Sequence, residues 1–270
     1  AATMEGYVLP ARHRDLYQGA VYPPRPNVLP LDQVLGQKPA WKELFALRAD
    51  PSTRPFLEAL HVGSQEEIRQ RAAMMASVDE GVGLLLQTLE EIGELDRTCI
   101  VFLGDNGFFF GEHGLGAERR FPYEEGIRTA FFVRYPPRIR AGSEIREMVL
   151  ALDIAPTMIE LAGGVPGAQI QGRSLVPLMD GKAPAWRSSF LIEYYNESAW
   201  PWIVGMSYKA LRTERRKLIH WVHKDGMDEL YDLARDPYEI TNLIRDPAYA
   251  AERAALQAEL RRQVAESFGL

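Results

Sequence analysis

The stretch Thr98-Cys99-Ile100-Val101-Phe102-Leu103-Gly104-Asp105-Asn106-Gly107 decides the fold class of this sequence. Its first six residues are almost continuously apolar and partly β-branched, which predicts a strand covered on both faces, as in a parallel sheet. Its last four residues form a turn in which glycines flank an acid and an amide. In an open α/β sheet, ligands bind beyond the carboxyl ends of the strands, so this turn is the first candidate site.

The neighbouring segments extend this unit. Upstream, apolar residues mostly three, four or seven apart predict a helix over residues 64–93 with one buried stripe. Downstream, residues 130–133 predict a second strand, and a helix near residues 154–162 is expected to have Asp153 as its N-cap. Strands alternating with helices are typical of α/β folds. We therefore expect residues 1–185 to form part of a mixed, mostly parallel sheet flanked by helices.

Both ends of the chain differ from this unit. Residues 1–62 are rich in proline and are expected to be irregular, with side chains such as Trp41 anchoring them to the core. Beyond residue 185, short strands are expected at 189–195, 208–213, 217–222 and 229–233. A final helix over residues 247–267 would cover them, so residues 186–270 predict a small α+β subdomain with an antiparallel sheet.

Composition argues against two classes of function. Acidic residues outnumber basic ones by 37 to 31, so no broad basic field is expected and nucleic acid is not an expected partner. No apolar stretch approaches the roughly 20 residues that a membrane-spanning helix needs. The single cysteine, Cys99, cannot form a disulfide within the chain, and its apolar neighbours indicate a small core residue.

The turn after the first strand has two interpretations. Asp105 and Asn106 offer the hard oxygen ligands that Ca²⁺ and Mg²⁺ prefer, and glycine on each side allows a sharp bend. The same letters are also an ordinary turn sequence. Two further motifs follow in order: Gly111-Glu112-His113-Gly114-Leu115, then Arg119-Arg120-Phe121-Pro122-Tyr123-Glu124-Glu125-Gly126-Ile127-Arg128.

This series resembles the type I, formylglycine-dependent sulfatases of the alkaline-phosphatase superfamily. Their corresponding segment is written S-D-N-G, G-E-H-G and K-R-x-x-Y-E-E-x-I-R. The resemblance continues at residues 152–157, 161–163, 172–175, 229–233, 236–239 and 242–243, and upstream at residues 10–17 and 26–27. It covers nearly the whole chain, matches the C-terminal portion of such an enzyme, and includes a general likeness to glucosamine-6-sulfatase-type chains.

The resemblance implies roles for four residues. Asp105 and Asn106 match the pair that binds a divalent cation, usually calcium, and the two other carboxylates of that site fall outside this sequence, which leaves a half-site. Arg119 aligns with a lysine that holds the sulfate, and arginine keeps the charge but offers a planar fork. His113 lies where a loop faces the pocket in similar enzymes, so substrate contact and a hydrogen bond to backbone both stay open.

Other charged residues are interpreted as structural. Tyr123, Glu124 and Arg128 are expected to hold the loop in shape. His13 and the run Arg215-Arg216-Lys217 are expected at solvated surfaces.

The sequence contains no candidate for the family's nucleophile. That nucleophile is a formylglycine made from Cys or Ser in a C/S-x-P/A-x-R motif, which does not occur here. The histidine that protonates the leaving group would also fall before residue 1. We therefore expect no catalytic residue within this chain and no sulfatase activity from the chain alone.

The implied function is hydrolysis of a sulfuric ester with a divalent metal. A sulfated carbohydrate is the favoured substrate class, partly because of Glu193-Tyr194-Tyr195. A phosphonate monoester or phosphodiester hydrolase of the same superfamily stays open, as does a non-catalytic remnant or binding module. Such a chain is expected to expose a sheet edge and apolar surface and to self-associate. The resemblance favours a periplasmic, extracellular or lysosomal location.

Overall fold

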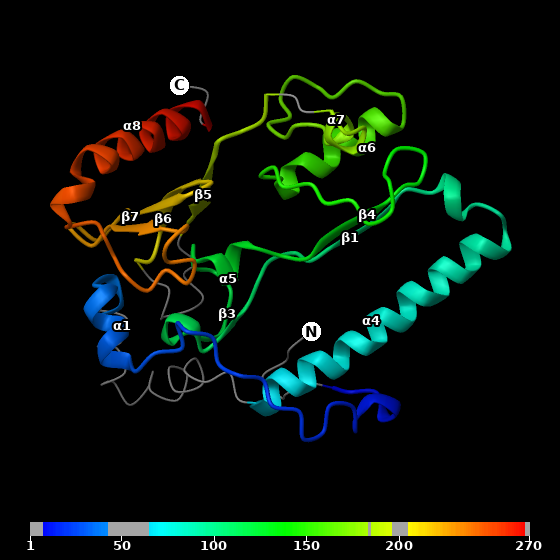
Figure 1. The fold of residues 1–270 in the computed structure, drawn as a ribbon, viewed down its shortest axis with the longest axis horizontal. Helices are drawn as coiled ribbons and strands as arrows, with labels where there is room; N and C mark the ends of the chain where they lie inside the picture. The colour runs from blue at the N-terminus through cyan, green and yellow to red at the C-terminus, as the bar shows by residue number, and fades with distance from the viewer. Residues whose placement is uncertain (1–7, 43–64, 183–184, 196–204, 268–270) are drawn as a thin grey trace.

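The computed structural model describes residues 8–42, 65–182, 185–195 and 205–267 (Figure 1). Its helices are α1 (Leu31–Gln37), α4 (Gln65–Glu91), α5 (Glu124–Ile127), α6 (Ile154–Leu161), α7 (Val176–Met179) and α8 (Ala250–Ser267). Its strands are β1 (Ile100–Leu103), β2 (Phe109–Phe110), β3 (Gly116–Glu118), β4 (Phe131–Arg134), β5 (Ser189–Tyr194), β6 (Tyr208–Thr213), β7 (Arg216–Trp221) and β8 (Glu229–Asp232). Short 3₁₀ turns include η1 (Ala11–His13) and η4 (Glu112–Gly114).

β1 and β4 form an antiparallel pair, with Leu103 opposite Phe131. The parallel neighbour expected for this apolar strand is not found among the described residues. The connection gives the reason, because a parallel pair is usually joined by a crossover helix, whereas the 104–130 connection contains the hairpin β2–β3 and the four-residue helix α5. Leu103 is 38% exposed and Phe132 is 66% exposed, so the described chain does not cover both faces of this pair.

The helix expected over residues 64–93 is confirmed as α4. Its expected buried stripe is wrong for the described chain: Ala73 is the one buried side chain of this helix, while Leu84 and Leu85 are each 67% exposed. The apolar spacing therefore predicts the helix correctly, but the described residues leave much of its apolar surface exposed. No described helix combines the length and apolarity that crossing a membrane requires.

The start of the chain packs on α4 through η1. His13 is 4% exposed, with Nδ1 2.9 Å from Ser77 Oγ and Nε2 2.6 Å from Glu80 Oε1. The expectation of a solvated His13 is therefore wrong, because two side chains of a distant helix supply both of its hydrogen-bond partners.

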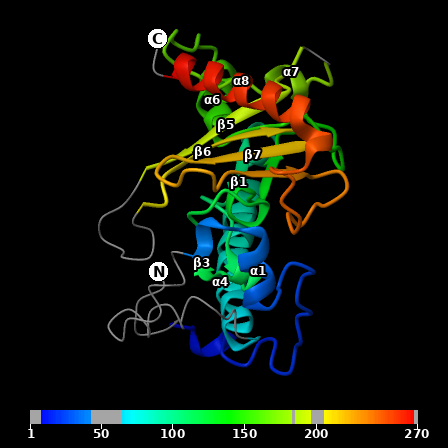
Figure 2. The ribbon, with the colours of Figure 1, turned by 90° about the vertical axis from the view of Figure 1, so that its left-hand side faces the viewer.

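The four C-terminal strands form an antiparallel sheet in the order β5-β6-β7-β8, and α8 covers one face (Figures 1 and 2). The covered face buries Leu211, Leu218 and Leu230 against Leu256 and Leu260 of α8. The small antiparallel sheet, the C-terminal helix and the mixed helix-and-sheet class are confirmed.

The opposite face of this sheet forms the main core together with the N-terminal and central segments. Trp41 is completely buried, and its ring centroid lies 4.5 Å from that of Phe121 and 6.2 Å from that of Trp221. The expected anchoring role of Trp41 is confirmed. Because Phe121 follows β3 and Trp221 ends β7, this core attaches the central loop to the four-stranded sheet.

Asp153 does not cap α6 as expected. Its own backbone is helical, and its carboxylate accepts the N–H groups of Leu150 and Arg173, each at 2.8 Å. Both oxygens also lie 2.6 Å from the guanidinium of Arg187. The carboxylate therefore ties three segments together and leaves the first turn of the helix uncapped.

Candidate functional site

The tip of β1 carries the first candidate residues. Asp105 and Asn106 follow Leu103 after one glycine; Asp105 is exposed and Asn106 is half-buried. Asn106 N donates to Asp105 Oδ1 at 2.9 Å, and Asn106 Nδ2 donates to Gly107 O at 2.6 Å. Within the described residues, nothing donates to Asn106 Oδ1 or to Asp105 Oδ2. Two hard oxygen atoms are therefore available to a cation.

A short hairpin brings Arg119 to the same end of the loop. β2 and β3 pair antiparallel, with Phe109 opposite Glu118. The chain enters β2 from Asn106 and leaves β3 into Arg119, so both residues lie beyond the same end of the ladder. Arg119 is exposed, and its guanidinium forms no ion pair or hydrogen bond with the part of the chain that the structure describes.

The strand tip packs directly on α5. Gly107 N donates to Gly126 O at 2.9 Å. A Cβ atom added at Gly107 would lie 1.9 Å from Glu125 O and 2.5 Å from Arg128 O. Only glycine fits at this close approach, so the position of Asn106 depends on the position of α5.

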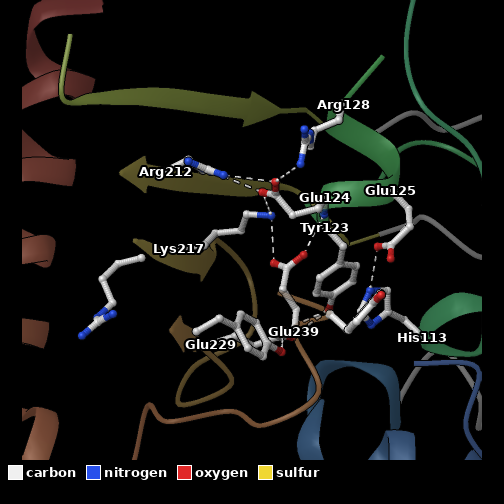
Figure 3. Close-up of polar contacts among 12 residues, drawn as sticks. His113, Tyr123, Glu124, Glu125, Arg128, Arg212, Lys217, Glu229 and Glu239 are labelled. Atoms are coloured by element: carbon white, nitrogen blue, oxygen red, sulfur yellow. Dashed lines mark hydrogen bonds and ion pairs between the residues drawn. The ribbon is translucent and has the colours of Figure 1, made fainter. Parts of the chain in front are cut away.

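α5 is held in turn by buried charges from the four-stranded sheet (Figure 3). Lys217 Nζ lies 2.8 Å from Glu124 Oε1 and 2.8 Å from Glu239 Oε1, and Arg212 Nη2 lies 3.2 Å from Glu124 Oε2. Burial alone would raise the pKa of Glu124, but Lys217 and Arg212 lower it to about 2. Lys217 is completely buried, so its expected solvated position is wrong. Arg128 is 76% exposed and 3.9 Å from Glu124, and it adds little.

Glu229 is at the centre of a second buried network of hydrogen bonds, which contacts the loop through Tyr123. Its carboxylate accepts hydrogen bonds from Tyr123 Oη at 3.0 Å, Trp221 Nε1 at 3.1 Å and Tyr231 Oη at 2.5 Å. Lys38 Nζ donates to Tyr231 Oη at 2.6 Å and lies 3.9 Å from the Tyr123 ring centroid. Burial lowers the pKa of Lys38. The expectation that Tyr123 and Glu124 hold the loop in shape is thus confirmed.

Two family models match overlapping parts of the chain. The model described as Sulfatase matches residues 22–165, and the model described as N-sulphoglucosamine sulphohydrolase, C-terminal, matches residues 111–266. The chain belongs to the sulfatase family. Arg119 and α5 lie within residues 111–165, where the two matches overlap, and the strand tip lies within the Sulfatase match, so the candidate site is part of the sulfatase fold.

Curated sulfatases resemble the chain over part of their length. The chain is 40% identical over 195 residues to an N-acetylglucosamine-6-O-sulfatase of Bacteroides thetaiotaomicron, which covers 71% of this chain and 34% of the relative. It is 35% identical over 205 residues to the human N-acetylglucosamine-6-sulfatase, covering 66% of this chain and 37% of that protein. The chain thus spans about a third of the length of these two sulfatases.

Solved structures share the fold. One, solved in complex with its substrate D-glucosamine-2-N,6-O-disulfate, superposes with a TM-score of 0.76 at 27% identity, covering 95% of this chain and 62% of the other. The phosphonate monoester hydrolase of Agrobacterium radiobacter superposes with a TM-score of 0.66 at 29% identity, covering 75% of this chain and 43% of the other.

His113 lies beneath the sulfatase loop and not on its surface. It is 1% exposed, and its ring stacks on Tyr123 with centroids 4.2 Å apart. Its Nε2 lies 3.0 Å from Glu125 Oε2 and 3.1 Å from Asn27 Nδ2. Burial, and next the charge of Lys38, lower the pKa of His113 to about 3. Substrate contact through Nε2 would require this network to open.

His113 also belongs to a second group of side chains that could bind a metal ion. Ligand atoms of His113, Glu125 and Glu239 lie within 4.8 Å of one another. Glu239 already has partners, however: its Oε1 lies 2.8 Å from Lys217 Nζ, and its Oε2 accepts the backbone N–H of Glu124 at 2.7 Å. A cation there would also meet the charge of buried Lys217, so the oxygens at the strand tip fit a metal better.

The sequence pattern gives no role to three buried charged residues of this site, namely Lys38, Glu118 and Glu229. Glu118 directly precedes two arginines, and that order is a usable signal for a local ion pair. Glu229 lies in a stretch that resembles the family, but the resemblance implies no role for it. Lys38 stands in the proline-rich segment, where no periodicity indicates burial.

Proposed function

We propose that this chain is part of a sulfatase that hydrolyses a sulfate ester on an amino sugar. One observation carries the proposal: oxygen atoms of Asp105 and Asn106 and the guanidinium of Arg119 have no partner among the described residues, and they lie at the same end of one loop. The acidic side chain can bind a cation, and the guanidinium can bind an anion directly. An anion at this place could therefore contact both the bound cation and Arg119. Membership of the sulfatase family supports sulfate as that anion.

The chain's residues would divide the work as follows. Asp105 and Asn106 would hold part of a calcium or magnesium site, and the bound ion would neutralise charge on the sulfate oxygens. Arg119 would bind two sulfate oxygens through its planar fork. The buried ion pairs of Glu124 would keep α5, and with it the strand tip, in place. His113 would act from behind the loop by fixing Glu125.

The substrate class follows from the relatives. Two curated relatives are named for N-acetylglucosamine 6-sulfate, and the first solved neighbour holds a glucosamine disulfate. The experiment is a comparison of kcat/KM for N-acetylglucosamine 6-sulfate and for a phosphonate monoester, using the natural protein that carries this chain with a C/S-x-P/A-x-R segment. We expect the sulfate ester to be preferred and Asp105→Ala to lower its kcat/KM by about 10²–10³-fold.

A phosphonate monoester hydrolase is the second candidate. The Agrobacterium radiobacter enzyme, at 29% identity over 75% of the chain, favours keeping it. Preference for the phosphonate in the same comparison would select this candidate. Turnover of neither ester would support a non-catalytic binding module instead.

The metal assignment can be checked on the chain itself. We expect weak Ca²⁺ binding in a calorimetric titration, because only Asp105 and Asn106 contribute ligands here. Asp105→Asn should remove the remaining binding, whereas Asp228→Asn, which changes a carboxylate paired with His220 in the four-stranded sheet, should not. Loss of binding with Asp228→Asn and not with Asp105→Asn would show that the ion binds elsewhere.

A further inference from the structure

Two adjacent arginines at the end of β3 have different surroundings. The Arg119 guanidinium is exposed and has no ion pair or hydrogen bond within the described ranges. The Arg120 side chain is only 17% exposed, and its Nη1 lies 3.0 Å from Glu118 Oε1 and 3.3 Å from Glu118 Oε2. One of the two positive charges is therefore neutralised locally and the other is not.

Glu118 also fixes the backbone that carries both arginines. Its side chain is 1% exposed, and Oε1 accepts the N–H of Arg119 at 2.7 Å and the N–H of Arg120 at 2.9 Å. A carboxylate that accepts consecutive backbone N–H groups forms charge-assisted hydrogen bonds, which are stronger than neutral ones. These bonds define the direction in which the chain leaves β3.

The C-terminal sheet holds the same turn from the other side. Tyr208 Oη donates to Arg120 O at 3.0 Å. Tyr208 is 4% exposed, and its ring stacks on Tyr194 with centroids 5.7 Å apart and an interplanar angle of 22°. Glu118 of β3 thus binds the two N–H groups of the turn, and Tyr208 of β6 binds its last carbonyl. β3 and β6 are distant from each other in sequence.

We propose that Glu118 is a positioning residue for the sulfate site. It neutralises Arg120 and orders the turn, so that Arg119 alone presents a free, pre-oriented guanidinium to the sulfate. Holding a ligand-binding side chain in its bound direction before binding lowers the ordering cost and so raises affinity. This inference rests on the proposed function, because it takes Arg119 as the residue that binds the anion.

The charge of Glu118 and its positioning role predict opposite effects. A carboxylate near an anion repels it, so a residue that acted through its charge alone would weaken sulfate binding, and Glu118→Gln would then strengthen it. A positioning residue predicts the reverse, because the neutral amide is a weaker acceptor for the two N–H groups and releases Arg120. The sign of the change therefore separates the two explanations.

The test uses inorganic sulfate titrated into the full 270-residue chain and followed through the arginine Nε–H signals by NMR. We expect Arg119→Ala to lower sulfate affinity at least about tenfold. Glu118→Gln should lower it about three- to tenfold, the range for the net contribution of one ordinary hydrogen bond, because the amide keeps an acceptor oxygen but loses the charge. Glu118→Asp should retain most of the affinity, because aspartate accepts the N–H two residues ahead in an Asx-turn.

Two further variants serve as control and as second test. Glu112→Gln makes the same change to a glutamate that is 3% exposed and accepts Phe110 N at the opposite end of the hairpin, and it should leave sulfate affinity unchanged. Tyr208→Phe removes only the hydroxyl that holds Arg120 O, so it should lower the affinity about twofold to fivefold even if Glu118→Gln does not fold. Hydrogen exchange at the backbone amides of residues 119 and 120 should be faster in Glu118→Gln than in the wild-type chain. It should stay unchanged in Glu112→Gln.

The outcomes separate this inference from the proposed function. If Arg119→Ala lowers sulfate affinity while Glu118→Gln and Tyr208→Phe leave it equal or higher, the positioning role is overturned and the anion site stands. If sulfate does not bind, or binds equally well to Arg119→Ala, both the sulfate role of Arg119 and the positioning role are overturned.

Discussion

At the scale of single residues, the buried histidine of the loop determines how the fold responds to acid. His113 is completely desolvated, and in the folded chain it takes up a proton only near pH 3, against its usual pKa of 6.5. Between these values the unfolded chain binds the additional proton, so stability falls as the pH falls. Glu239, whose pKa burial raises to about 7, contributes in the opposite direction.

We therefore predict that His113→Gln flattens this acid dependence. Between pH 7 and pH 5 the wild-type chain should lose about 2 kcal/mol more unfolding free energy than the variant, as measured by urea denaturation at each pH. His220→Gln, which changes a half-exposed histidine on β7, is the control and should keep the wild-type dependence. Parallel curves for wild type and His113→Gln would contradict the prediction.

The sequence indicated the exposed candidate residues of this site but not the buried ones. Asp105, Asn106 and Arg119 could be selected because glycine-flanked turns and motif order are visible locally. Lys38 and Lys217 could not, because charged residues are rarely fully buried and their partners lie far away in the chain. Lys38 Nζ, for example, donates to the backbone of Glu239, 201 positions further on.

At the scale of elements, the candidate site depends on contact between the tip of β1 and α5. An added methyl group at Gly107 would collide with the carbonyl oxygen of Glu125 in α5, at 1.9 Å, and with that of Arg128 directly after it, at 2.5 Å. We predict that Gly107→Ala lowers the unfolding free energy by about 3 kcal/mol, because backbone atoms must shift to make room. Chemical denaturation would measure the loss.

Gly83→Ala is the matched control for this substitution. Nothing lies within 4 Å of a Cβ atom at Gly83 in the middle of α4, so alanine should raise stability by up to about 1 kcal/mol. An equal effect of the two substitutions would show that the close contact at Gly107 is unimportant.

Lys217 links β7 to α5, and its loss should be costly. Lys217→Met would leave Glu124 and Glu239 close together without the cation that lies 2.8 Å from each. Removing one partner of a buried ion pair typically costs about 3–5 kcal/mol, and we expect a loss in that range by denaturation. Lys182→Met, at a side chain that is 69% exposed, should change stability by less than about 0.5 kcal/mol, and a similar loss there would contradict this account.

Elements with a clear period were predictable and short ones were not. Residues 208–213 and 229–233 were predicted as short strands between turns, and the structure confirms them as β6 and β8. β2 and β3 have two and three residues, too few to show a period, so the hairpin that places Arg119 was missed. The antiparallel pairing of β1 with β4 could not be predicted, because an apolar run does not state which strand will pair with it.

At the scale of the whole molecule, one core joins the central loop to the C-terminal sheet. Tyr123 and Trp221 belong to the same buried cluster as Trp41. We keep a boundary near residue 185 as a proposal for the chain's organisation. The shared core predicts that residues 1–185 and 186–270 stabilise each other, as do the ion pairs between α5 and β7.

The long helix α4 leaves this molecule with an exposed apolar surface. Leu84 and Leu85 are each 67% exposed, Ile92 is 62% exposed and Phe132 of β4 is 66% exposed. Large apolar side chains exposed together favour association, because burying them removes apolar area from water. We therefore propose that the chain self-associates through α4.

Sedimentation velocity on the 270-residue chain at micromolar concentrations tests this proposal. We predict dimers or larger species, and we predict that Leu84→Lys with Leu85→Lys shifts them to monomer, because each buried leucine contributes about 1.5–3 kcal/mol and each new lysine must stay hydrated. Gln87→Lys adds a charge to an already polar, exposed position of the same helix and should leave the distribution unchanged. A wild-type chain that sediments as a monomer, or association that survives the double substitution, would exclude α4 as the contact surface.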